Sequence, residues 1–337
     1  MQPSRRPDYT TTLRKRLEDM HTRVTDLLAI RYPIVQGGLQ HLALPELCAA
    51  VSNAGALGQL TAAAFPTPDA LRDAIELTRS LTQYPFGINF AIGTRPLANH
   101  LNAALEAGIR VFSFTGGNPE FFFQQLRGRD VCTLVLVAAV RQARKAEELG
   151  ASAVIAVGFE GGGHIGRDDV GTMVLVPRVV DAVGIPVLAS GGIGDARGLV
   201  AALGLGAEGI EMGTRFVATQ ECPAHPAYQD ALCRASETDT MIIERSIRRP
   251  SRTLKGPWSE RILELERQGA TLEGLLPLIS GDVNYRAARE GDLEHGFVWA
   301  GQVVGLIDDL PTVAELIQRM VDGAETIRGR LDELLTK

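Results

Sequence analysis

One histidine in this chain stands at the end of a glycine-rich turn, where its side chain could do acid–base chemistry. The turn runs Gly158-Phe-Glu-Gly-Gly-Gly-His164-Ile-Gly166 and follows an apolar segment, residues 153–157, which reads as a buried strand. Glycines bring the backbone close to whatever occupies a pocket, because they carry no side chain. A neutral imidazole can take a proton or hold a developing anion near neutral pH. A lone histidine is more often a solvated bystander, but this context favours a catalytic role for His164.

Two further glycine turns follow the next two apolar segments. The segment ending at Ser190 continues into Gly191-Gly192, and the segment ending at Met212 continues into Gly213-Thr214. Glycine at a strand end lets backbone N–H groups approach a phosphate, and a following helix N-terminus adds a favourable field. The glycines could instead serve only as tight turns. Two consecutive strand ends of this composition favour a phosphate cup for a phosphorylated cofactor or substrate.

Polar residues also follow earlier strands. The first predicted strand continues into Gln36-Gly37-Gly38-Leu39-Gln40, and Asn89 lies in a later strand. Glu160, inside the histidine turn, could orient His164 or face solvent, and the sequence does not decide between these roles. No metal site is expected in this turn, because no second histidine or carboxylate stands at ligand spacing.

The turns belong to a repeated alternation of strand and helix. The apolar segments predict eight strands, at residues 32–35, 56–60, 86–91, 109–114, 131–137, 153–157, 185–190 and 209–212. Helical patterns follow them, with residues 303–320 as the eighth helix. This repeat predicts an α/β fold, a (β/α)8 TIM barrel whose active site lies at the carboxyl ends of the strands. A doubly wound open sheet is the alternative, but no G-x-G-x-x-G follows the first strand.

Two segments fall outside the repeat. Residues 1–23 are polar and basic, with a helical pattern over 10–20, and are interpreted as an N-terminal extension. Residues 221–300 are broken by prolines and otherwise helical in pattern, which predicts an inserted helical lobe over the barrel mouth. The barrel itself then comprises residues 24–220 and 301–337. Within the lobe, an arginine cluster is interpreted as a solvated face or a receptor for an acidic group, and the tryptophans Trp258 and Trp299 as lobe packing. The cluster consists of Arg245, Arg248, Arg249 and Arg252.

Composition excludes several classes of function. A net charge of −6 over 337 residues argues against nucleic acid as the main partner, since phosphate binding needs a basic face. No apolar run approaches the roughly 20 residues of a membrane helix, and no apolar region follows the basic N-terminus as it would in a signal peptide. The four cysteines show no C-x-x-C pairing, which fits reduced thiols in the cytoplasm.

Several of these segments, taken together, resemble the nitronate monooxygenase (2-nitropropane dioxygenase-like) family. This family also includes flavin-dependent enoyl-ACP reductases and NAD(P)H:quinone reductases. The similarity covers roughly residues 24–325, and the glycine–histidine turn is its most specific piece. The other matching segments are Pro33-Ile-Val-Gln-Gly-Gly38, Phe86-Gly-Ile-Asn89, Ala189-Ser-Gly-Gly-Ile193, Met212-Gly-Thr-Arg-Phe216, Glu221-Cys-Pro-Ala-His-Pro226 and Trp299-Ala-Gly-Gln-Val-Val-Gly305.

The resemblance implies a barrel that binds FMN without a covalent bond. It implies that the turn Gln36–Gln40 lies along the flavin ring, through Gly38, Leu39 and Gln40, with Gln36 and Gly37 also counted as cofactor-binding and Asn89 nearby. Gly162 would line the pocket, and His164 would be the active-site histidine. The phosphate would be held by Ser190, Gly191, Gly192, Gly213 and Thr214. Leu136 stands where some relatives carry lysine, and Ala91 where some carry a hydroxyl, so the flavin would lack a nearby cation.

Three functions are compatible with this resemblance. The first is oxidation of an alkyl nitronate by FMN with O2. The second is an NADH- or NADPH-dependent reductase that passes electrons through FMN to a quinone or an enoyl thioester. The third is a flavin-binding protein without turnover. The missing dinucleotide fingerprint favours the first. A small-molecule substrate is expected in any enzymatic case; the oligomeric state is left open, with a homodimer as the assembly considered.

Overall fold

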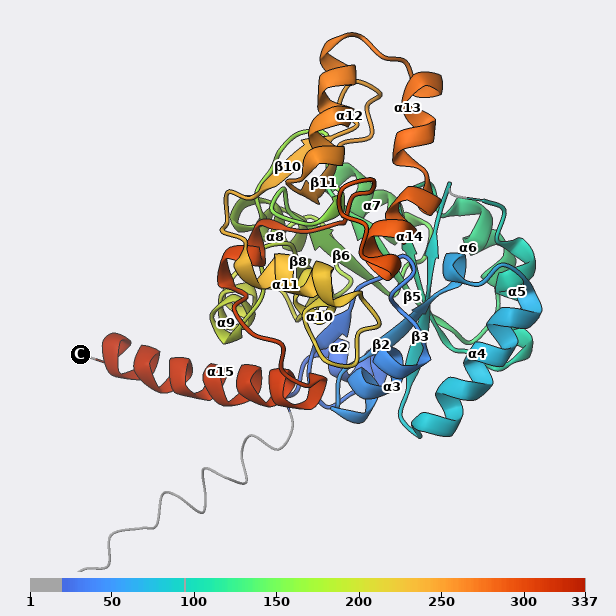
Figure 1. Cartoon of the computed structure of the whole chain (residues 1–337). Coiled ribbons are helices and arrows are strands. Elements are labelled where there is room, and N and C mark those ends of the chain that lie inside the picture. Colours follow the sequence, from blue (N-terminus) through green and yellow to red (C-terminus); the bar gives the residue numbers. More distant parts are fainter. Residues whose placement is uncertain (1–19, 94, 337) are drawn as a thin grey trace, which may run out of the picture.

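A closed sheet of eight parallel strands forms the centre of the computed structural model, which describes residues 20–93 and 95–336 (Figure 1). A parallel bridge between Val35 and Leu57 joins the first and last strands of the sheet and closes the circle. The predicted (β/α)8 TIM barrel is therefore confirmed. In order around the barrel the strands are β1 (Ile34–Gln36), β9 (Gly209–Met212), β8 (Val187–Ser190), β6 (Ala153–Val157), β5 (Cys132–Val137), β4 (Val111–Thr115), β3 (Phe86–Ala91) and β2 (Gly58–Thr61).

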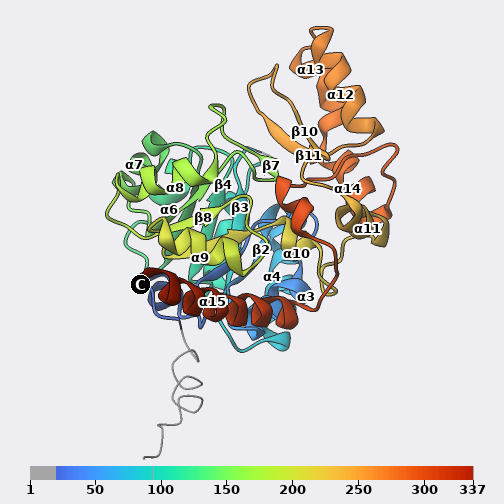
Figure 2. The same ribbon diagram turned by 90° about the vertical axis from the view of Figure 1, so that its left-hand side faces the viewer.

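Helices follow the strands and cover the outside of the barrel (Figures 1 and 2). Local signals set several of their starts: the side chains of Thr67 and Asp195 each accept a backbone N–H bond from the first turn of the helix that follows. These helices are α3 (Pro45–Asn53), the 3-10 helix η1 (Ala62–Ala64), α4 (Pro68–Leu81), α5 (Ala98–Glu106), α6 (Glu120–Leu126), α7 (Val140–Glu148), α8 (Thr172–Val180), α9 (Ala196–Gly204) and the short α10 (Thr214–Val217).

The eighth helix differs from its prediction. The expected helix over residues 303–320 is replaced by a 3-10 turn, η2 (Gln302–Leu306), and a long helix, α15 (Val313–Leu335), which packs against α9 and α3. The reason is local: Thr312 and Glu315 form a capping box, in which each side chain bonds the backbone N–H of the other. The start signal at Thr312 therefore overrides the apolar pattern that begins nine residues earlier, at Val303.

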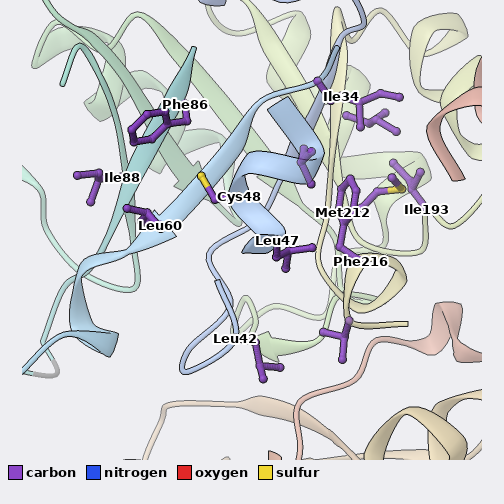
Figure 3. Packing of buried hydrophobic residues seen from close by; sticks show 14 of the residues in the cluster. Ile34, Leu42, Leu47, Cys48, Leu60, Phe86, Ile88, Ile193, Met212 and Phe216 are labelled. Carbon is purple, nitrogen blue, oxygen red and sulfur yellow. The ribbon is translucent and has the colours of Figure 1, made fainter. Parts of the chain in front are cut away.

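Side chains of the strands alternate between two apolar layers. Outward-facing residues such as Ile34, Leu60 and Met212 pack against Leu47 and Cys48 of α3 (Figure 3). Each fully buried aliphatic side chain contributes roughly 1.5–3 kcal/mol to stability. These contacts fix the helices on the strands and so determine which residues end at the barrel mouth.

The inward-facing residues near the amino ends of the strands form a second, smaller core. It contains Leu134, Ile155 and Leu188, and helix α2 (Arg23–Leu28) closes it from below with Val24 and Leu28. The expected extension over 1–23 reaches the barrel at Arg23, where α2 begins. Residues 1–19, which include nearly all of the helical pattern at 10–20, lie outside the described part of the chain. The apolar floor leaves the carboxyl ends of the strands as the polar end of the barrel.

The part of the inserted segment at residues 240–279 forms a lobe beyond this polar end, drawn in orange at the top of Figures 1 and 2. The prediction of a helical lobe was incomplete, because it also contains two antiparallel strands, β10 (Thr240–Ile243) and β11 (Ser251–Leu254). A two-residue strand of the histidine turn, β7 (Gly163–His164), pairs with β11 and ties the lobe to the mouth. The helices of this segment are α11 (Pro226–Arg234), α12 (Pro257–Arg267), α13 (Leu272–Ile279) and α14 (Gly281–Glu290).

Candidate active site

The two glycine turns predicted to hold a phosphate lie side by side at the ends of β8 and β9, which are paired strands. Gly191 and Gly192 have φ angles of +91° and +77°, a left-handed backbone that side chains rarely adopt. A Cβ on Gly191 would lie 3.1 Å from the carbonyl oxygen of Gly158 in the neighbouring histidine turn. The loops after β6 and β8 are therefore packed backbone to backbone, which only glycine allows.

The two hydroxyl groups of this cup are engaged within the protein. Ser190 Oγ donates to the Oε2 atom of Glu211 at 3.0 Å, and Thr214 Oγ1 accepts from the backbone N–H of Gly301 at 3.0 Å. Gly162 lies against the same segment, since a Cβ on it would be 2.7 Å from the Gly301 nitrogen. Backbone N–H groups of the turns are thus the principal donors that the cup can offer to an anion.

The residues predicted to lie along a flavin ring gather around Gly38. A Cβ on Gly38 would lie 2.2 Å from Oδ1 of Asn89, whose Nδ2 donates to Ser113 Oγ at 3.0 Å. Leu39 reaches the phosphate cup, where its Cδ2 atom is 3.4 Å from the Cβ position of Gly213. Gln40 instead lies against the lobe, with its Nε2 2.9 Å from the Cβ position of Gly281. The ring side and the phosphate side of the predicted site are therefore contiguous.

Gln36 and Gly37 have structural contacts at the same place. The Oε1 and backbone oxygen atoms of Gln36 accept hydrogen bonds from the backbone and side-chain nitrogens of Gln59, at 3.0 and 2.8 Å. This exchange joins β1 to β2 beside the bridge that closes the barrel. Gly37 donates its N–H to the Met212 carbonyl at 2.9 Å, on the other side of β1. The side chain of Gln36 is thus part of the frame of the site.

Two polar residues of β2 were not predicted as part of the site. Gln59 and Thr61 are buried, and within the described part of the chain Gln59 Oε1 and Thr61 Oγ1 have no hydrogen-bond partner. Thr61 pairs with Asn89 of β3, so these unpartnered atoms lie next to the predicted ring position. Buried polar atoms usually have partners, and a polar ring edge would supply them. The alternation of Gln59 and Thr61 with Leu60 is a signal for these positions, although Thr61 lies one residue beyond the predicted strand at 56–60.

His164 lies on β7, where the histidine turn meets the lobe. Its ring centroid is 5.6 Å from that of Trp299, and its Nε2 lies 3.5 Å from Nη2 of Arg249. The side chain of His164 is exposed to solvent, yet the protein packed around the ring lowers its pKa to about 4, and the charge of Arg249 acts in the same direction. A pKa of about 4 leaves the imidazole neutral at physiological pH.

Glu160 does not orient this histidine through a direct bond. Its carboxylate accepts hydrogen bonds from the backbone N–H of Thr172, at 2.9 Å, and from the Thr172 hydroxyl, at 3.0 Å. Thr172 is the first residue of α8, so Glu160 supplies the cap that this helix start needs. Its role is to hold the loop after β6 against the helix.

The arginine cluster divides between surface and interior. Arg252 is only 3% exposed and donates to the carbonyl oxygen of Phe159 and to Thr240, which contradicts a uniformly solvated face. Arg245 pairs with Asp169 at 3.0 Å, Arg248 is exposed, and Arg249 approaches His164. Trp258 packs within the lobe as expected, whereas Trp299 also contacts the histidine. Arg249 is thus the member of the cluster that lies beside His164.

We also searched the described residues for a metal-ligand cluster, a membrane-spanning helix and a disulfide. No three histidine, cysteine, aspartate or glutamate side chains there come together as metal ligands do. The same residues include no helix with the length and apolar character required to cross a membrane. The four cysteines are free; Cys48 and Cys222 are buried, and Cys132 and Cys233 are partly buried.

A closed (β/α)8 barrel with glycine turns after its last strands and a polar mouth defines a TIM-barrel enzyme. The family model described as nitronate monooxygenase matches residues 21–323. A probable nitronate monooxygenase of Staphylococcus saprophyticus is 32% identical, over 92% of this chain and 99% of its own. The structure of FabK from Thermotoga maritima superposes with a TM-score of 0.87 at 39% identity, over 94% of this chain and all 100% of that one.

A third relative carries a different name. It is a (3aS,4S,5R,7aS)-5-hydroxy-7a-methyl-1-oxo-octahydro-1H-indene-4-carboxyl-CoA dehydrogenase of Rhodococcus jostii, 34% identical over 94% of this chain and 99% of its own. The chain belongs to the nitronate monooxygenase family. It is accordingly a flavin-dependent oxidoreductase, as its relatives are. The glycine cup, the unpartnered atoms of Gln59 and Thr61 and the neutral histidine fit a flavin at this mouth.

Proposed function

We propose that this chain is an FMN-dependent nitronate monooxygenase, which oxidises alkyl nitronates with O2. The observation that carries the proposal is the neutral His164 beside Arg249, with 3.5 Å between Nε2 and Nη2. A nitronate is already an anion and needs no base to form. Its parent nitroalkane is a neutral carbon acid, which a base with a pKa of about 4 would deprotonate poorly. A cation next to a neutral hydrogen-bonding ring therefore suits the nitronate.

FMN is the flavin that the cup suits best. The turns at 190–192 and 213–214 offer backbone N–H groups to one terminal phosphate, and the turn at 36–40 with Asn89 offers a surface for the ring. When bound, FMN supplies the electron transfer between the substrate and O2. The part of this chain is to hold the phosphate, to support the ring and to place the anionic substrate between the barrel mouth and Arg249.

A second candidate is a reductase that takes electrons from NADH or NADPH and passes them to a quinone or an enoyl thioester. Its support is the 39% identity with FabK at a TM-score of 0.87, together with a relative named for a CoA thioester. A flavin-binding protein without turnover is set aside, because the family consists of enzymes.

Anaerobic mixing of the purified flavoprotein with each reductant separates the two functions. Bleaching of the flavin absorbance by a nitronate, followed by recovery on admission of O2, is the expected result. Bleaching by NADH or NADPH, with no response to nitronate, would overturn the proposal in favour of the reductase. A parallel sample with the parent nitroalkane tests the argument from the low pKa of His164, since it should react much more slowly than the nitronate.

A further inference from the structure

Glu211 is a buried carboxyl group inside the polar end of the barrel. It lies on β9, its Cα pairs with Val35 of β1 and Ser190 of β8, and its exposure is 6%. The one hydrogen bond on its carboxyl comes from Ser190 Oγ, at 3.0 Å to Oε2, among the contacts of the described residues. Burial of a carboxyl group with only one hydrogen bond is unfavourable in free energy, which indicates that Glu211 has a functional role.

Glu211 lies between the two halves of the site. On the ring side, a Cβ on Gly37 would come within 3.3 Å of the Glu211 Cδ atom and 3.4 Å of Oε1. On the phosphate side, the turn Gly213–Thr214 begins two residues later, directly after the same strand ends at Met212. A molecule that reaches from the cup to the ring position must therefore pass the carboxyl, and glycine at position 37 keeps Oε1 accessible. Carboxyl oxygens bind hydroxyl groups well.

The carboxyl of Glu211 has a pKa near neutral pH. Burial raises its pKa to about 7, although the hydrogen bond from Ser190 acts in the opposite direction. Neither flanking strand carries a charged side chain, since β1 reads Ile-Val-Gln and β8 reads Val-Leu-Ala-Ser. The next basic residue along the chain, Arg215, is turned toward Asp309 and the Ala218 carbonyl. A phosphate placed in the cup would add negative charge and favour the protonated carboxyl.

We propose that the carboxyl of Glu211 binds the hydroxylated chain between the ring and the phosphate of the flavin, and takes up a proton from solvent when FMN binds. The proton converts the carboxylate to a carboxylic acid, which both donates to and accepts from hydroxyl groups. This inference rests on the proposed FMN site. It predicts that FMN binds less tightly as the pH rises above 7, because the carboxyl must then be protonated at a greater cost.

Calorimetric titration of the flavin-free full-length protein with FMN tests the proposal. At pH 7.5, in two buffers of different ionisation enthalpy, the wild type should take up about half a proton or more per FMN bound. Glu211→Gln should bind FMN with almost no uptake, and its affinity should be flat from pH 7 to 8.5. Riboflavin, which lacks the phosphate, should cause a smaller uptake in the wild type.

Two further variants keep the test decisive. Ser190→Ala removes the one hydrogen bond on the carboxyl and raises its pKa before FMN binds, so the uptake should shrink. Glu208→Gln serves as the matched control, because this nearby carboxylate pairs with Arg23 outside the site and its loss should leave the uptake unchanged. Equal uptake in the wild type and Glu211→Gln, or none in the wild type, overturns the inference. Failure of the wild type to bind FMN overturns the proposed function instead.

Discussion

The guanidinium of Arg249 and the imidazole of His164 meet at the barrel mouth, with 3.5 Å between Nη2 and Nε2, although 85 residues separate them in the chain. The pairing of β7 with β11 produces this contact, because it places Ser251 opposite His164 and so brings the preceding arginine to the histidine turn. The lobe is therefore part of the candidate active site. Arg249 of the lobe supplies a positive charge, and His164 of the barrel supplies an imidazole that is neutral at physiological pH.

Replacement of His164 by alanine should separate flavin binding from turnover. The phosphate cup and the ring turn lie on other loops, so the variant should purify with its yellow colour. Turnover of nitronate should fall by about 10²- to 10³-fold, the usual loss when a positioned hydrogen-bonding group is removed. Absorbance spectra and steady-state kinetics measure both effects. His295→Ala, in an exposed pair with Asp292, is the control and should remain fully active; full activity of His164→Ala would rule out the proposed role.

The pH dependence of the reaction should report the low pKa of His164. The value of kcat/KM should be constant from pH 8 to about 5 and fall as the ring becomes protonated near its pKa of about 4. Since the ordinary pKa is 6.5, the folded chain also binds fewer protons than the unfolded chain between these values. Stability associated with this group is therefore complete above pH 6.5 and is lost as the pH falls through 4.

Arg249→Gln should shift this profile. Loss of the positive charge raises the pKa of His164, so the acid limb of the pH profile should move to higher pH. The KM for an anionic nitronate should also rise about 10-fold, because a charge-assisted hydrogen bond is lost. Arg249→Lys keeps the charge and should retain much of the native profile. An unchanged profile in Arg249→Gln would show that burial alone sets the histidine pKa.

Gly191→Asp should empty the flavin site. The residue has a φ of +91°, and a Cβ there would lie 3.1 Å from Gly158 O and from Gly161 N. The added carboxylate also repels a phosphate in the cup. The variant should purify colourless, which absorbance at the flavin band measures directly. Gly204→Asp, where a Cβ meets no atom within 4 Å, is the control and should stay yellow.

Gly58→Ala should destabilise the barrel without touching the mouth. A Cβ on Gly58 would lie 1.9 Å from the backbone carbonyl oxygen of Cys48 in α3, so the helix must move away from β2. Overpacking of this kind costs roughly 1–3 kcal/mol, which thermal unfolding detects as a lower Tm. Gly204→Ala, in open space on α9, should leave the Tm unchanged or slightly higher. Equal Tm values for the two variants would contradict the close packing of α3 on β2.

Local patterns in the chain were enough to define the barrel and the order of its glycine turns. Apolar segments and capping residues are local signals, so the strand at 86–91 was predicted with the bounds that β3 has, and the phosphate-type turns fall at paired strand ends. The same locality explains one error: the apolar pattern at 303–320 predicts the last helix too early, whereas the capping box at Thr312 sets its start.

The partner of each polar group, by contrast, depended on the tertiary structure. Arg249 at His164, Glu160 at the start of α8 and Gln59 beside Gln36 are contacts between segments distant in sequence. Such contacts depend on how whole elements pack, and a periodic pattern carries no information about that. The pairing of β11 with the histidine turn likewise arises only when the barrel and the inserted segment come together, and β10 adds to the same sheet through β11.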